Sequence, residues 1–426
     1  MNITAHADID VVAVEQPGSV SVLLELVAPE NDADQDAEPR PPAAVQVVLD
    51  RSGSMAGGNL EAAKEALARL VDRLDPADRL GVVAFDDAVS VPLAAAPLTD
   101  KPRAKRAITA IHSGGMTNLS GGLLRGLQEA RRAKGEAGAT LLLLSDGHAN
   151  EGEIDPDRLG AVAAKAAGDG ITIATIGVGL GYDETLLAEI ARGGRGDHLF
   201  AEHGDAAAGA VAAQVEGLLE KTVQSASLLV RPAEPVQTVR IWNDLPSTGL
   251  DEGIMVELGD LWAGEERSLV LSFDVPAAST LGLAEVATLE LRYVALPDLV
   301  EETVSIPVHV NVVPGDQAAG RIPDPKVRSE LVYQQAQDAK RRGADALSRG
   351  DAAGADRAYR STDALLAAGM AACPPGPRRA ELATERDILA ELAEQASAGE
   401  ADLSAKRARS EHARKSRKRG RGDGSR

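Results

Sequence analysis

Carboxylate and hydroxyl side chains follow two apolar runs of the sequence and occupy one Gly-rich stretch between them. Five of these residues have the types and spacing of a binding site for a hard cation: Asp50, Ser52, Ser54, Thr117 and Asp146. Two carboxylates and three hydroxyls form an oxygen-only set, which suits a small hard ion such as Mg²⁺. Mg²⁺ also keeps part of its coordination shell as water or as a ligand from another molecule.

The first of these stretches, DRSGSM at 50–55, has a second explanation. Asp and Ser are common at helix N-termini because their oxygens accept hydrogen bonds from free backbone amides. Apolar residues at helical spacing follow over 60–74. Taken alone, the stretch therefore indicates either a helix cap or part of a cation site.

Residues 43–224 alternate between short, uniformly apolar runs and amphipathic helical patterns. This alternation is typical of a parallel sheet with helices on both faces, and it predicts a doubly wound, mostly parallel α/β fold. Strands are expected at 45–49, 80–85, 88–93, 139–145, 171–179 and 197–202, and helices at 60–74, 101–111, 119–133, 157–167, 183–191 and 206–222. Ligands of such sheets bind beyond the carboxyl ends of the strands, so the five candidate residues are expected at one edge.

The motifs DRSGSM, GGMTNL and SDG, in this order, resemble a von Willebrand factor type A domain with an intact metal-ion-dependent adhesion site. The resemblance implies that three hydroxyls coordinate the metal, while Asp50 and Asp146 act through water or hold those hydroxyls. It also implies a site for Mg²⁺, with Mn²⁺ and Ca²⁺ as alternatives. Met116 departs from the family pattern, in which a small or polar residue is common at this place.

Further polar residues are expected on the rim of this edge. His148 and Asn150 follow Asp146, and Asp86 and Asp87 end the run 80–85. They either contact a partner or are simply solvated. The resemblance itself implies a protein partner whose Asp or Glu completes the metal's coordination, and hence a metal-dependent interaction module or scaffold.

The whole layout is similar to bacterial relatives of the inter-alpha-trypsin-inhibitor heavy chain and of proteins labelled calcium-activated chloride channels. Two other functions stay open. One is an accessory subunit of a MoxR-type ATPase chaperone or of a metal-insertion complex. The other is a structural type A module whose metal site is empty.

The rest of the chain divides by its sequence pattern into five further segments. Short alternating runs over 225–313 predict an antiparallel β-sandwich, to which the strand-like residues within 1–42 are expected to pair. A linker is expected at 314–325, α-helices at 326–400 and a disordered basic tail at 401–426. The α/β domain is therefore expected as an insertion.

Composition limits the classes of function. The 426 residues carry a net charge of −20, which disfavours nucleic-acid binding by the body of the chain, although the basic tail could contact an anionic surface. A single cysteine, Cys373, and no signal-like N-terminus or apolar span favour the cytoplasm. No enzyme is expected: nothing pairs a nucleophile with a base, and His198 and His203 have no zinc-ligand spacing.

Overall fold

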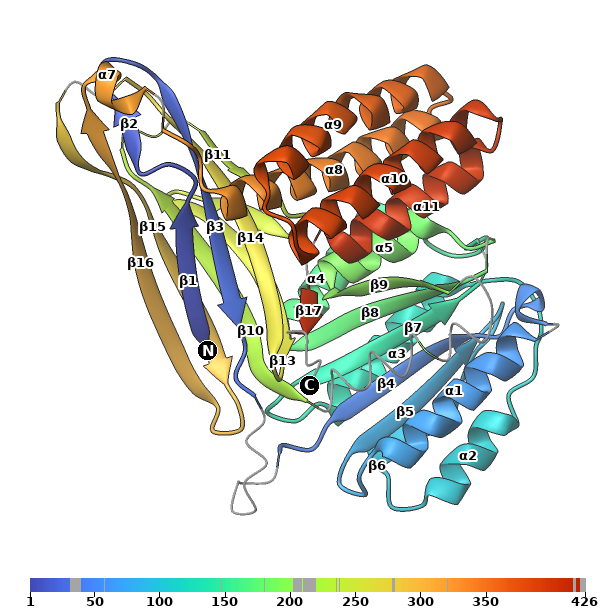
Figure 1. The fold of residues 1–426 in the computed structure, drawn as a ribbon. Coiled ribbons are helices and arrows are strands. Elements are labelled where there is room, and N and C mark those ends of the chain that lie inside the picture. Colours follow the sequence, from blue (N-terminus) through green and yellow to red (C-terminus); the bar gives the residue numbers. More distant parts are fainter. Residues whose placement is uncertain are drawn as a thin grey trace.

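The computed structural model describes the chain except residues 31–39, 57, 147, 180, 202–208, 210–219, 235, 237, 278–279, 320, 417–418 and 422–426. The described chain forms an α/β unit, a β-sandwich and a helical bundle (Figure 1). This confirms the expected fold class. Among the described residues, no helix is both long and apolar enough to cross a membrane.

The α/β unit is built on a six-stranded sheet in the order β6-β5-β4-β7-β8-β9. All neighbouring pairs are parallel except β5 and β6. The central strands β4 and β7 are buried along their whole length, as expected for strands covered on both faces. The six strands are β4 (Ala44–Asp50), β5 (Arg79–Phe85), β6 (Val89–Pro97), β7 (Ala139–Ser145), β8 (Ile171–Val178) and β9 (Arg195–Ala201).

Helices cover the two faces of this sheet and bury two separate apolar clusters. Alternate residues of β4 point to opposite faces, so Val47 and Leu49 pack with α1 and α2, whereas Val48 packs with α3. Helices α4 and α5 share the α3 face. The helices are α1 (Asn59–Arg73), α2 (Lys101–Thr109), α3 (Leu119–Ala133), α4 (Pro156–Gly168) and α5 (Glu184–Gly193), with a short 3₁₀ helix η1 (Gly53–Met55).

The end of the α/β unit differs from the sequence prediction. Most of the helix expected at 206–222 falls outside the described residues. Its last two positions, 221 and 222, belong to strand β10 (Lys221–Pro232) instead. The β-sandwich therefore begins before the expected boundary at 225.

The β-sandwich combines strands from both sides of the α/β unit. One sheet has the order β1-β3-β14-β11, and the other β12-β13-β10-β15-β16-β2. Its strands are β1 (Asn2–Ala7), β2 (Val11–Ala13), β3 (Gly18–Val27), β10, β11 (Thr238–Ile241), β12 (Ser247–Leu250), β13 (Gly253–Trp262), β14 (Glu265–Val275), β15 (Gly282–Ala295) and β16 (Val300–Val313).

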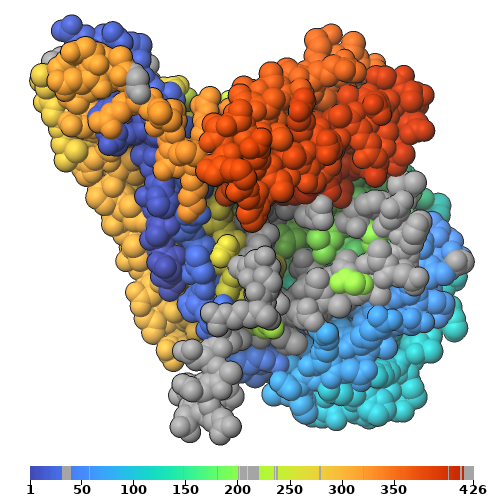
Figure 2. Space-filling view, in the orientation of Figure 1, coloured from blue at the N-terminus to red at the C-terminus, as the bar shows by residue number. Residues whose placement is uncertain are grey.

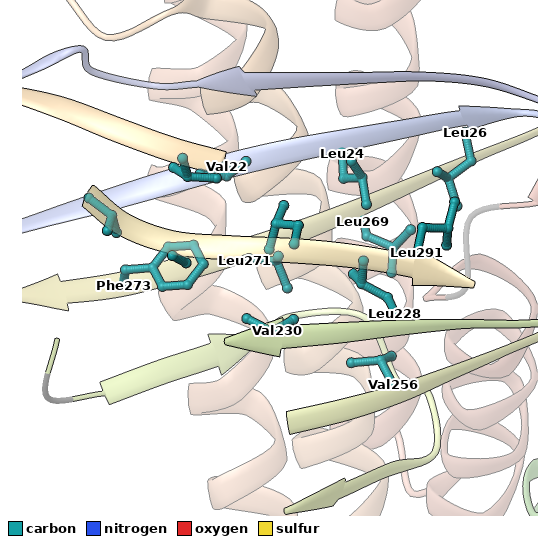
Figure 3. Close-up of a cluster of buried hydrophobic side chains, with 14 of the residues drawn as sticks. Val22, Leu24, Leu26, Leu228, Val230, Val256, Leu269, Leu271, Phe273 and Leu291 are labelled. Carbon is teal, nitrogen blue, oxygen red and sulfur yellow. The ribbon is translucent and has the colours of Figure 1, made fainter. Parts of the chain in front are cut away.

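Strand β3 lies in the middle of the first sheet, between β1 and β14. It pairs with β14 in antiparallel register from Gly18 to Val27. Its side chains Val22 and Leu24 pack among residues of β10, β13 and β14, as the close-up shows (Figure 3). Because β3 and β14 flank the α/β unit in sequence, that unit is an insertion within the sandwich.

The C-terminal part is a bundle of four long helices, three of them in the segment 326–400 that was expected to be helical, and it packs against the other two parts (Figure 2). Its contacts include Arg409 Nη1 to Glu184 Oε1 of α5 at 2.7 Å. The segment preceding it contains α7 (Gly315–Ala318). The bundle consists of α8 (Pro325–Ser348), α9 (Ala352–Ala372), α10 (Pro377–Ser397) and α11 (Ala401–Lys415).

The prediction of a disordered tail at 401–426 was wrong for its first fifteen residues, which form α11. This segment folds as a helix because its buried residues follow helical spacing, whatever its basic charge. Ser404, Ala405, Ala408 and His412 recur at helical intervals and are all buried in the bundle. After α11, a short strand β17 (Arg419–Arg421) pairs with β14.

Candidate metal site

The carboxylate of Asp50 is the innermost group of the predicted site. It is fully buried at the end of β4, where Oδ1 accepts a hydrogen bond from the Ser52 amide at 2.8 Å. Oδ2 accepts one from Ser145 Oγ at 2.5 Å. Burial raises the pKa of Asp50, and the hydrogen bonds from Ser145 and Ser52 oppose this shift only in part. Asp50 is thus a buried carboxylate held by neutral donors.

A chain of hydrogen bonds links the two serines of DRSGSM to Asp146. Ser52 Oγ lies 3.0 Å from Ser54 Oγ, and Ser54 Oγ donates to Asp146 Oδ1 at 2.7 Å. The other oxygen of Asp146 accepts a hydrogen bond from Asn59 Nδ2 at 2.8 Å. Residues at the ends of two neighbouring strands therefore share one polar network, although they are far apart in sequence.

The helix-cap explanation of DRSGSM was wrong. Ser52 stands at the N-terminus of η1, but its side chain makes no capping hydrogen bond. Helix α1 begins later, after Gly58, which also provides no side-chain cap. The hydroxyls of Ser52 and Ser54 are instead directed into the network with Asp146.

The loop that carries Thr117 reaches the same edge through close backbone contacts. The Gly53 amide donates to Gly115 O at 3.1 Å, and the Gly114 amide donates to Arg51 O at 2.7 Å. A Cβ atom at Gly114 would lie 2.2 Å from Asp86 Oδ2. The glycines of this loop therefore permit an approach that a larger residue would block.

Thr117 itself is buried and is bound through its backbone to Asn150. The Thr117 amide donates to Asn150 Oδ1 at 2.9 Å, and the Asn150 amide donates back to Thr117 O at 3.2 Å. The structure thus brings Asp50, Ser52, Ser54 and Asp146 into one hydrogen-bonded set and places the Thr117 loop beside it.

Four neighbours of this set have roles that the sequence did not assign. Ser145 and Asn59 hold the two carboxylates, and Asn150 holds the Thr117 loop. Asp86 is buried rather than a solvated rim residue, and it pairs with Arg51 at 3.0 Å. Burial favours a higher pKa for Asp86, but the Ala88 amide and the Arg51 charge outweigh it, so the pKa is lowered. The sequence placed Asp86 and Asn150 at this edge without these roles, and the position of Ser145 directly before Asp146 was a further signal.

One spacing between hydroxyl oxygens at this edge is compatible with a hard cation. Neighbouring ligands of an octahedral Mg²⁺, each about 2.0–2.1 Å from the ion, lie about 2.9 Å from each other. The Ser52 and Ser54 hydroxyl oxygens are 3.0 Å apart, which fits one edge of that octahedron. Within the described part of the chain, no three His, Cys, Asp or Glu residues form a group that could hold a metal ion.

His198 has a structural environment. Its Nδ1 lies 2.8 Å from Thr175 Oγ1 and its Nε2 lies 3.3 Å from the Tyr182 hydroxyl, all within the buried α3 face of the sheet. His203, the other histidine considered from sequence, lies outside the described residues.

Comparison with known proteins adds three similarities. A family model described as the von Willebrand factor type A domain matches residues 45–213. An uncharacterized protein of Synechocystis sp. is 30% identical over 248 residues, which cover 56% of this chain and 58% of that protein. Inter-alpha-trypsin inhibitor heavy chain H3 of Homo sapiens is 30% identical over 190 residues, which cover 42% of this chain and 21% of that protein.

A solved structure extends the similarity beyond the α/β unit. A von Willebrand factor type A protein from Catenulispora acidiphila superposes with a TM-score of 0.68 at 19% identity, covering 92% of this chain and 88% of that one. This likeness concerns the fold alone. The chain spans less than two thirds of the two curated relatives, 58% of one and 21% of the other.

Proposed function

Since a von Willebrand factor type A domain model matches residues 45–213, we propose that this protein binds a partner protein through a divalent cation held at the carboxyl edge of the α/β sheet. Domains of this family are generally interaction modules, and the oxygen-only set here suits Mg²⁺, with Mn²⁺ and Ca²⁺ as alternatives. The hydrogen-bonded chain from Ser52 through Ser54 to Asp146 is the observation that carries the proposal.

In this proposal the hydroxyls of Ser52, Ser54 and Thr117 are the ligands. Asp50 and Asp146 orient those hydroxyls and supply negative charge behind them, as outer-shell carboxylates do in other metal sites. Mg²⁺ bound mainly by neutral oxygens stays electrophilic and keeps positions for outside ligands. An Asp or Glu of the partner would take one of these positions, so the protein is an interaction scaffold and not an enzyme.

The buried position of Asp50 supports the same proposal. A carboxylate without a cationic partner is costly to bury, and a divalent ion nearby would offset that cost. The donors to Asp50 are a hydroxyl and a backbone amide, and those to Asp146 are a hydroxyl and a side-chain amide. We expect the protein to act in the cytoplasm, in keeping with its single cysteine.

Isothermal titration of the full chain with MgCl₂ and with MnCl₂ tests the metal site. We expect one ion per chain for the wild type and a loss of affinity of about 10–100-fold for Ser54→Ala and Thr117→Ala. Ser113→Ala is the matched control, because Ser113 is an exposed hydroxyl of the Thr117 loop. A wild-type protein that binds neither ion, or a Ser54→Ala variant that binds as well as Ser113→Ala, would contradict the proposal.

A further inference from the structure

Exposed apolar side chains of the α/β unit gather beside the candidate metal site. Among the residues that the structure describes, the α/β unit has four large apolar side chains that are more than a third exposed. They are Val89 at 38%, Met116 at 55%, Leu124 at 48% and Ile154 at 53%. Scattered single apolar residues on a surface need no explanation, but a group at one place marks an interaction site.

All four surround the N-terminal half of α3. Met116 immediately precedes Thr117, and Leu124 lies in the second turn of the helix. Val89 starts β6 and pairs with Phe85, whose ring lies 2.5 Å from the place a Cβ of Gly122 would take. Val89 is therefore on the sheet face that α3 covers.

Ile154 reaches this surface because the loop after Asp146 runs alongside the start of α3. The Thr117 and Asn150 backbones are joined, and the Glu153 amide donates to Ser120 Oγ at 2.9 Å. The loop places Ile154 beside the first turn of α3. We call Val89, Met116, Leu124 and Ile154 the apolar rim.

The charges next to the apolar rim are mostly negative. Asp87 and Asp157 are exposed, whereas Glu153 is paired with Arg158 at 2.9 Å. Asp87 lies against the Thr117 loop, with Oδ1 2.4 Å from where a Cβ of Gly115 would stand. The whole chain carries a charge of −20. A strongly acidic partner segment would be repelled here, even though one carboxylate is wanted at the metal.

We propose that the partner presents a single carboxylate, with a large apolar side chain next to it and basic residues on either side. The carboxylate goes to the metal, the apolar side chain packs on the apolar rim, and the basic residues face Asp87 and Asp157. The inference rests on the proposed function, and it adds a partner class that the metal site alone does not specify. Met116 and Ile154 are its specificity-determining residues.

Short synthetic peptides provide a direct test with the full chain. The probe is acetyl-Lys-Asp-Leu-Lys-amide, and three matched peptides replace Leu with Ser, Asp with Asn, or both Lys with Glu. The chain has only five methionines, so the labelled ε-methyl of Met116 is a resolvable NMR reporter, assigned by Met116→Leu. Titrations are followed in millimolar Mg²⁺ and again in EDTA.

We expect the probe to shift the Met116 methyl signal in Mg²⁺ and not in EDTA. The Ser-containing and Glu-containing peptides should each bind at least about fivefold more weakly than the probe. Ile154→Ser should weaken binding of the probe by a similar factor. Leu283→Ser should leave it unchanged, because Leu283 is 75% exposed but lies on β15 in the sandwich.

The outcomes separate this inference from the function on which it rests. If the Ser-containing or Glu-containing peptide binds as well as the probe, the partner class is wrong while metal-dependent binding stands. If the Asn-containing peptide binds equally, or binding survives EDTA, the proposed function itself is wrong. The inference is overturned if the protein binds Mg²⁺ but no peptide shifts the Met116 signal. It is also overturned if the signal shifts with protein concentration alone, because the occupant of the apolar rim is then a second copy of the chain.

Discussion

The helical bundle and the edge of the α/β sheet bury carboxylates in opposite ways. In the helical bundle, Glu385 accepts hydrogen bonds from Lys340 Nζ at 2.5 Å and from Lys415 Nζ at 2.7 Å. Burial alone would raise the pKa of Glu385, but the Lys340 and Lys415 charges reverse this and lower it. At the sheet edge, Asp50 is held by neutral donors and its pKa is raised.

The difference separates a structural charge cluster from the candidate metal site. The bundle supplies its own cations, so its carboxylate is stable as an anion inside the folded chain. The sheet edge supplies only hydroxyl and amide groups to Asp50 and Asp146, so a cation from solution would improve it. Four variants test this contrast, from the largest expected effect to the smallest.

Replacing Lys340 by Met should have the largest effect on stability. The Lys340 side chain is fully buried, and removing one partner of a buried ion pair typically costs about 3–5 kcal/mol. Urea unfolding followed by circular dichroism measures the change. Arg386→Met is the control, since its pair with Asp363 is exposed and should matter far less. Equal midpoints for the two variants would show that the bundle does not depend on its internal cation.

Asp146→Ala should remove the stabilisation that Mg²⁺ gives to the wild type. A ligand at 100 times its Kd stabilises a folded protein by about 2.7 kcal/mol. The difference between unfolding in MgCl₂ and in EDTA should therefore be about this size for the wild type and close to zero for the variant. Asp157→Ala, an exposed carboxylate at the start of α4, should keep the full difference.

Glu385→Gln should change how stability depends on acid. Because the folded-state pKa of Glu385 is lowered, its contribution is present above the ordinary value of 4.5 and is lost as the pH falls through the lower folded-state value. At neutral pH the variant should be less stable by about 1.5–3 kcal/mol, the range for hydrogen bonds to charged groups. This gap should shrink in urea titrations below about pH 4. If the stability difference between the variant and the wild type does not change with pH, the difference comes from packing and not from the charge of Glu385.

The same carboxylate-to-amide change at the sheet edge should have the smallest effect, and of the opposite sign. In EDTA at neutral pH, Asp50→Asn removes a buried anion that neutral groups hold, so stability should stay within about 1 kcal/mol of wild type, on the stabilising side. Titration with Mg²⁺ should show weakened binding in the same protein. If Asp50→Asn is strongly destabilised in EDTA, the Asp50 carboxylate stabilises the fold as Glu385 does, and the contrast between the two regions is wrong.

Most of the α/β unit was predictable because its signals are local. Uniformly apolar runs such as 45–49 indicate strands buried on both faces, and the carboxyl-edge rule then gathers residues that are far apart in sequence. Asn59 and Asn150 were not assigned because an amide that holds a carboxylate or a loop has no pattern of its own. Their roles depend on where loops meet.

Helix α11 shows how composition can conceal periodicity. Its high Lys and Arg content suggested a solvated tail, yet two small residues, Ser404 and Ala408, form a buried stripe with His412. In that stripe, His412 Nδ1 lies 3.0 Å from Gln337 O. No local sequence pattern predicts this contact. Small side chains contribute little to an apolar pattern, although they permit close helix packing.

The insertion of the α/β unit within the sandwich has a consequence for biosynthesis. Ser21 of β3 and Ser272 of β14 lie opposite each other, although they are 251 residues apart. During synthesis on the ribosome, β3 emerges first and has no β14 to pair with until the whole α/β unit has been made. The candidate metal site can therefore be complete before the sandwich closes, and the first strands need shielding from other nascent chains during that interval.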